Sequence, residues 1–187
     1  MALLSSAGHW LVGAFVLPVA VLVAFEANGR LTESPWRYLV PDLIILSGIA
    51  LAGYIVFHAG LDRAPEMVQY ALGSDKQIQH FVIAAAVVII GVSEWLSRRA
   101  PRNASYWRYV WPIAYMAMGL GLIFHDQSGP QVAAVRLYHV LLGLVVLSAS
   151  FARLGQVSGL VAWRASGLVF AGLLAIESGM LLAFRAP

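Results

Sequence analysis

Long apolar runs separated by short polar connectors constrain this chain most strongly. A helix needs about 20 apolar residues to cross a bilayer core. Six runs approach that length, namely Gly8–Phe25, Leu39–Ala59, Ile78–Leu96, Tyr109–Phe124, Ala133–Phe151 and Leu160–Phe184. Only 11% of residues are charged, against roughly a quarter in a soluble domain. Because the runs also lack the alternation of barrel strands, we predict an all-α, polytopic membrane bundle of about six transmembrane helices, one domain over residues 1–187.

The distribution of Lys and Arg predicts the orientation. One side of the bundle carries eight arginines: Arg30, Arg37, Arg98, Arg99, Arg102, Arg108, Arg153 and Arg164. The other side carries four basic residues: Arg63, Lys76, Arg136 and Arg185. Basic residues favour the cytoplasmic side, so we expect both termini in the periplasm and the protein in a bacterial inner membrane. The first apolar run has no basic residue before it and is expected to be a retained helix, not a cleaved signal peptide.

All five histidines fall at one end of the expected bundle, whichever way it faces. His58 ends the second run and His80 opens the third, while His125 ends the fourth and His139 opens the fifth. The inward runs His80-Phe-Val-Ile-Ala and His139-Val-Leu-Leu-Gly are similar, and His9-Trp-Leu-Val-Gly looks like a third version. The pattern indicates a weak internal repeat that gathers imidazoles at the periplasmic face.

This histidine cluster predicts a metal site. Imidazole is the commonest protein metal ligand, and the chain has no cysteine that would compete. Facing helices of a bundle can bring such side chains together. The candidate ligands are His58, His80, His125, His139, Asp62, Asp126 and Glu177. A nitrogen-rich site with carboxylates nearby suits a copper ion, with zinc as an alternative.

Three other interpretations stay open. His58, His80, His125 and His139 are also candidate ligands of haem b in an electron-transfer subunit, where the glycine-rich surfaces around Gly48, Gly53, Gly119 and Gly121 would fit a macrocycle or close helix packing. A zinc ion could activate water in a membrane hydrolase. The histidines could instead mark the interface of a purely structural subunit.

The sequence favours a binding protein over an enzyme. It contains no nucleophile elbow, HExxH motif or phosphate-binding loop. Short connectors favour metal handling, or a small subunit of a larger membrane complex or homo-oligomer. The net charge of +3 comes from arginines beside the expected spans, so the partner is the lipid bilayer and not nucleic acid.

Buried charges and tryptophans complete the expectations. Glu177 lies within the last run, where a carboxylate is costly and therefore a candidate metal ligand, proton carrier or hydrogen-bonded packing residue. Glu94 stands four residues before Arg98, a spacing that favours an ion pair, and is expected mainly at the interface. The tryptophans map near run ends: Trp10, Trp36, Trp95, Trp107, Trp111 and Trp163. They are expected to form an interfacial belt.

One stretch resembles a known family. The pattern of Phe57-His58-x-Gly60, a connector to His80, and Ser93-Glu94 inside an apolar run is similar to the core pattern of the transmembrane protein 45 family of multi-span proteins. In that family an FHxHG element precedes a histidine-bearing helix start and an intramembrane glutamate. Gly60 stands here in place of the second histidine. The resemblance implies that His58, His80 and Glu94 share a site, and it brings no established reaction.

Overall fold

The computed structural model describes residues 2–31, 35–57, 64–73, 75–100, 106–124 and 132–185. Within these residues the chain forms α-helices and two short 3-10 helices, with no strand. In chain order they are α1 (Ala2–Ala27), η1 (Pro35–Tyr38), α2 (Leu39–Phe57), α3 (Ala64–Leu72), α4 (Asp75–Arg99), η3 (Tyr106–Tyr109), α5 (Val110–Phe124), α6 (Val132–Ser158) and α7 (Trp163–Ala183). The predicted all-α membrane-type bundle is confirmed.

Five of the helices are long and apolar enough to cross a membrane: α1, α2, α4, α6 and α7. The sixth expected span is α5, whose 15 residues reach only about 22 Å at 1.5 Å per residue. The four residues of η3 precede it directly and, at about 2 Å per residue, bring the combined length close to the roughly 30 Å of a hydrocarbon core.

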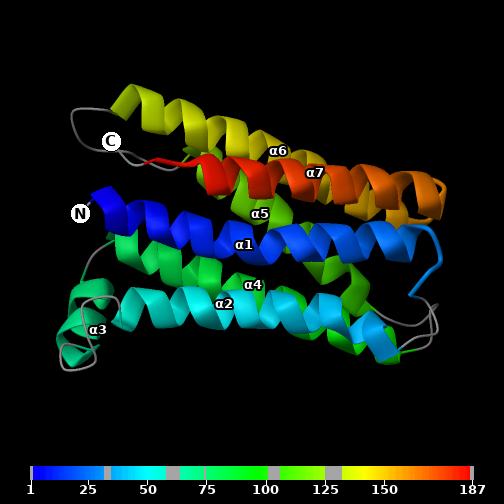
Figure 1. Cartoon of the computed structure of the whole chain (residues 1–187), viewed down its shortest axis with the longest axis horizontal. Coiled ribbons are helices and arrows are strands. Elements are labelled where there is room, and N and C mark those ends of the chain that lie inside the picture. Colours follow the sequence, from blue (N-terminus) through cyan, green and yellow to red (C-terminus); the bar gives the residue numbers. More distant parts are fainter. Residues whose placement is uncertain are drawn as a thin grey trace.

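Two segments differ from the sequence expectation. The connector between the second and third runs was expected to be polar and irregular, but it contains the short helix α3 at one end of the bundle (Figure 1). The fifth run was expected to end at Phe151, but α6 continues to Ser158. It can continue because the polar side chains of its last turns, Arg153 and Gln156, are bonded inside the protein.

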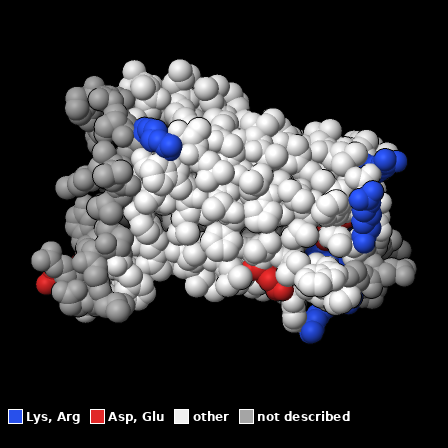
Figure 2. Space-filling model, viewed as in Figure 1, with Lys and Arg blue, Asp and Glu red and all other residues white. Residues whose placement is uncertain are grey.

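The six long helices form a closed ring. Along the ring α1 packs against α2, α2 against α4, α4 against α5, α5 against α6, α6 against α7, and α7 against α1. The two chain ends lie at the same end of the bundle, at the left in Figure 1. Figure 2 shows a broad uncharged band over the upper and central part of this face, with basic side chains nearer the ends and an acidic side chain at the lower edge. This band has the character of a lipid-facing surface.

The ring consists of three similar two-helix units, α2–α4, α5–α6 and α7–α1, whose members pack most extensively on each other. The second helix of each unit carries a histidine near its start, followed after 14 residues by a buried position. The three histidines are His9, His80 and His139, and the three buried positions are Val23, Glu94 and Arg153. The expected repeat is therefore threefold in the structure, with the third unit closed by the two ends of the chain.

A second motif supports the repeat in the first helices of two units. Trp36-Arg37-Tyr38 forms η1 and Trp107-Arg108-Tyr109 forms η3, and each is followed by a proline three residues after the tyrosine, Pro41 and Pro112. A proline in the first turn costs no helical hydrogen bond. Because this W-R-Y-x-x-P pattern recurs at the start of both helices, it is a clearer mark of the repeat than the histidines alone.

Small residues let the two helices of a unit approach closely. A Cβ added to Gly48 in α2 would lie 2.8 Å from the Ala84 carbonyl oxygen in α4, and one added to Gly143 in α6 would lie 2.7 Å from the Gly119 carbonyl oxygen in α5. Gly121 has no atom within 4 Å of such a Cβ. The surfaces at Gly48 and Gly119 thus serve helix packing, which was one of the two uses expected for them.

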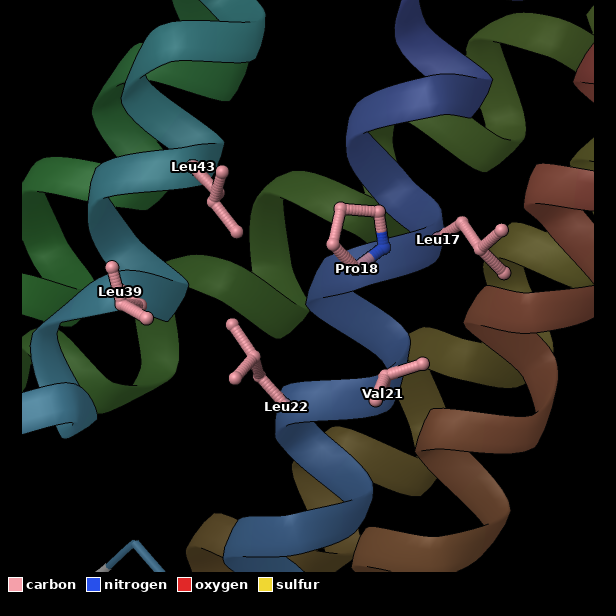
Figure 3. A pocket seen from close by; sticks show the side chains of 6 residues that line it. All are labelled: Leu17, Pro18, Val21, Leu22, Leu39 and Leu43. Atoms are coloured by element: carbon pink, nitrogen blue, oxygen red, sulfur yellow. The ribbon is translucent and has the colours of Figure 1, made fainter.

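An apolar groove opens between α1 and α2 (Figure 3). It is lined by Leu17, Pro18, Val21, Leu22, Leu39 and Leu43. A selective ligand site normally includes a few polar groups that orient the ligand, and none lines this groove. In a bilayer this surface would be covered by lipid chains, so the functional site must be sought at the bundle ends and in its interior.

Candidate functional site

Two imidazoles meet at the end of the bundle that holds both termini, which we call the outer end. His9 of α1 and His139 of α6 have ring centroids 6.1 Å apart, in an edge arrangement. His9 also stacks on Phe184 with centroids 4.1 Å apart. The indole N–H of Trp10 donates to the Phe184 carbonyl at 2.9 Å, which ties α1 to the end of α7. The pair is thus held by three helices.

A hydrogen bond within α6 determines which ring nitrogen of His139 carries the hydrogen. Its Nδ1 lies 2.8 Å from the Val135 carbonyl oxygen, and since a carbonyl can only accept, Nδ1 carries the hydrogen. In the neutral ring the basic nitrogen is then Nε2, the arrangement typical of metal-binding histidines. His139 is buried, and the neighbouring Tyr138 hydroxyl donates to the Met180 carbonyl of α7. The His139 ring is therefore held by its bond to Val135 on one side and by the Tyr138 ring on the other.

His80 occupies the equivalent position at the start of α4 and is half-buried. Three residues further on, Ile83 and its equivalent Val12 in α1 line the same central cavity. Residues three apart lie on one helix face, so His80 belongs to the face of α4 that looks toward the bundle axis. Among the described residues, however, no three His, Asp or Glu side chains are close enough to hold a metal ion.

The predicted ligands are only partly placed by the structure. His58, Asp62, His125 and Asp126 lie outside the described residues, although α2 and α5 end one residue before the two histidines. Glu177 stands seven residues before Phe184, which is roughly 10 Å along the helix axis. Its carboxyl group accepts a hydrogen bond from Tyr115 of α5 and not from a residue of the outer end. His9 is absent from the predicted ligands, although its sequence His-Trp-Leu-Val-Gly resembles the segments that begin with His80 and His139. That similarity could have identified it.

A second polar assembly fills the opposite end, which we call the inner end. Arg153 of α6 donates from Nη2 to both carboxylate oxygens of Glu94 in α4, each at 2.8 Å. Arg98, four residues after Glu94, donates to the same carboxylate from Nε at 3.1 Å and from Nη2 at 2.9 Å. The predicted Glu94–Arg98 ion pair is confirmed. Glu94 and Arg153 are both buried.

The same network extends to α1. Arg98 bonds both carboxylate oxygens of Glu26 at the end of α1, and also the backbone carbonyl of Arg37. Arg153 donates from Nη1 to the Gln156 side chain at 2.6 Å. Two carboxylates and two guanidinium groups balance in charge, as buried ions require. The network joins α1, α4 and α6, the second helices of the three units.

Three sequence expectations need correction here. Glu94 is not mainly interfacial, because it is enclosed by the two guanidinium groups. Arg153 does not lie in a connector but inside α6, where Glu94 compensates its charge. Trp111 does not belong to an interfacial belt, because it is buried, with the Arg153 guanidinium 5.0 Å from its ring and Phe170 5.1 Å away. A cation over an indole face is a favourable contact.

A small cavity lies between these two ends, within the ring of helices. Its volume is about 60 Å³, and residues of α1, α2, α4, α5 and α7 line it. Most of the lining is apolar, and its polar members are Ser47, Trp111, Tyr115 and Glu177. The Tyr115 hydroxyl donates to Glu177 Oε2 at 3.4 Å, a long hydrogen bond. The carboxyl group of Glu177 is therefore buried without an ion-pair partner among the described residues.

Comparison with known proteins adds no relative. No protein-family model, curated protein or solved structure matches the chain. The implied sharing of a site by His58, His80 and Glu94 stays a prediction. The function has to be inferred from the side chains themselves.

Proposed function

We propose that this protein binds a transition-metal ion, copper, at the outer end of its helix bundle. The main support for this proposal is the His9–His139 pair, whose ring centroids are 6.1 Å apart. An imidazole nitrogen lies about 2 Å from the metal it binds. Two imidazoles that share one ion therefore have centroids about 4.5 Å apart at a right angle and about 6.3 Å apart in a linear arrangement. The observed spacing matches a wide, near-linear angle at the ion.

His80 is the third ligand in this proposal. It stands at the equivalent position of α4 and on the axis-facing side of that helix. Because no three such groups meet within the part of the chain that the structure describes, His80 has to turn toward the pair when the ion binds. His58 and His125, which follow α2 and α5 in sequence, remain the predicted additional ligands.

The surroundings of the pair favour an ion that binds through nitrogen. Phe184 stacks on His9, and Tyr138 lies in edge contact with His139 at 5.9 Å between centroids. Aromatic walls restrict water and leave imidazole nitrogen as the main donor. Copper binds such sites more tightly than other divalent first-row metals. With the outer end in the periplasm, the protein would receive or hand over copper there, alone or as a subunit of a membrane complex.

Metal analysis combined with visible spectroscopy tests the proposal. The full chain is purified in detergent, loaded with Cu(II) or Zn(II), desalted and measured for bound metal, with an absorption spectrum of the unloaded protein. We expect about one copper per chain. His9→Ala and His139→Ala should each lower the affinity at least tenfold, because each removes one of a few ligands.

The matched control is Tyr138→Phe, which keeps both imidazoles and changes the same end of the bundle. It should retain copper with an affinity within about threefold of the unmodified chain, since it removes no ligand. Copper retention after both histidine substitutions would refute the proposal. A Soret band in the purified protein would replace it with the haem b interpretation, and preferential zinc retention with the zinc interpretation.

A further inference from the structure

We propose that the central cavity is a proton-binding site, in which Glu177 carries an exchangeable proton in the middle of the bundle. The site is separate from the metal site at the outer end, since Glu177 is roughly 10 Å along α7 from Phe184. It does not depend on whether copper binds there. Its elements are a buried carboxyl group, a phenol and a cavity that can hold water.

Burial and charge carry the first step. Glu177 is only 6% exposed, and it forms no ion pair with any described residue. An isolated charge in such a place is very costly, so a buried carboxyl group without a counter-ion takes up a proton instead. Glu94 shows the contrast within the same chain, because its carboxylate is bonded by two guanidinium groups.

The groups around the cavity contain no counter-ion for Glu177. Its lining from α1, α2 and α4 brings no titratable side chain, α5 brings Tyr115, and α7 brings Glu177 itself. Arg153 of α6 lies 5.0 Å from the ring of Trp111, which lines the cavity, but its guanidinium group is bound to Glu94. A neutral carboxylic acid, accepting from the Tyr115 hydroxyl, is the state that this environment supports.

The cavity supplies the second step, which is exchange. Its volume of about 60 Å³ exceeds the roughly 10–15 Å³ that a buried water molecule needs, so the cavity has room for water. A buried water needs two to four polar partners, and Glu177, Tyr115 and Ser47 provide them. Trp111 also lines the cavity. A hydrated carboxylic acid can pass its proton to water, whereas one sealed by apolar packing cannot.

Infrared spectroscopy of the full chain in lipid tests both steps. We expect a C=O stretching band of a protonated carboxylic acid at neutral pH, which Glu177→Gln abolishes. The band should shift on transfer to deuterated water, because the proton exchanges. Tyr115→Phe should move the band to higher frequency, because the carbonyl loses its hydrogen-bond donor.

The matched control is Glu94→Gln, which also neutralises a buried glutamate but should leave the band in place. Circular dichroism and gel filtration of each variant establish that it is folded. Absence of the band at neutral pH, or its persistence in Glu177→Gln, would overturn the assignment to Glu177. A band that does not shift in deuterated water would overturn the exchange step and make Glu177 a sealed packing residue.

Discussion

Replacing Arg153 with methionine is expected to destabilise the protein strongly. Arg153 makes two hydrogen bonds of 2.8 Å to Glu94 and one of 2.6 Å to Gln156. Methionine fills a similar volume but removes the charge, so the inner end keeps two carboxylates and one guanidinium group. Removing one partner of a buried ion pair costs about 3–5 kcal/mol.

The structure places the expected cost at the lower end of that range. Glu94 keeps its two bonds from Arg98 in the variant, so its charge is only partly uncompensated, and we expect a loss of about 3 kcal/mol. Adding Glu94→Gln removes the excess negative charge and leaves Arg98 paired with Glu26. The double variant should therefore lose less than the sum of the two single losses, by about 2 kcal/mol.

Unfolding by denaturing detergent in mixed micelles measures these free energies. A loss of about 3 kcal/mol lowers the folding equilibrium constant more than a hundredfold. Arg164→Met is the control, because Arg164 is exposed at the same end, and it should change stability by no more than about 0.5 kcal/mol. A loss below about 1 kcal/mol for Arg153→Met, or additive losses in the double variant, would refute this account of the pair.

Three further experiments have defined outcomes. Gly143→Ala should lower the unfolding free energy by about 1–3 kcal/mol, because its Cβ would meet the Gly119 carbonyl at 2.7 Å; Gly121→Ala, with open space around it, is the control, and equal losses would contradict the close-packing account. Ser150→Ala should cost about 1 kcal/mol in the same assay, because it removes the 2.7 Å bond to the Pro112 carbonyl, and no loss would mean that this bond is not needed. Because the chain has no cysteine, single cysteines at two exposed positions report the orientation: a membrane-impermeant maleimide should label Glu66→Cys from the periplasm and Ser158→Cys only after lysis. The reverse labelling pattern would mean that the orientation is inverted.

The sequence was sufficient for the helices because their evidence is local. Each long apolar run became a helix, although α1 begins before the expected Gly8 and α6 extends past the expected Phe151. Pro41 and Pro112 lie in the first turns of α2 and α5, as such positions allow. Helix α3 was missed because its short amphipathic stretch carries a weaker pattern than a span.

The polar interior was harder to predict because its partners are distant in sequence. The Glu94–Arg98 pair follows from helical spacing, but the bond from Arg153 crosses 59 residues, and no local rule connects them. Because Arg153 follows the expected end of its run at Phe151, the sequence alone assigns it to a connector. The repeat could have corrected this, since Glu94 and Arg153 each stand 14 residues after His80 and His139.

The histidine end shows the same limit. Sequence position was sufficient to place His80 and His139 at one end, but not to identify neighbours. The His9–His139 contact depends on α1 lying beside α7 and α6 beside α7, which is a property of ring closure. Only the packing of the whole chain brings those two rings together.

The closure of the ring by α1 and α7 has a consequence for biogenesis. α1 packs most extensively on α7, yet α7 leaves the ribosome after the five other helices of the ring. Until then α1 must wait in the bilayer with Gly13 facing lipid, its carbonyl lacking the hydroxyl of Ser178 that bonds it at 2.8 Å in the finished protein. We expect nascent chains truncated before Trp163 to be captured by insertion chaperones and degraded, and separately expressed α7 to rescue them; rapid folding of the truncated chain without α7 would contradict this order of assembly.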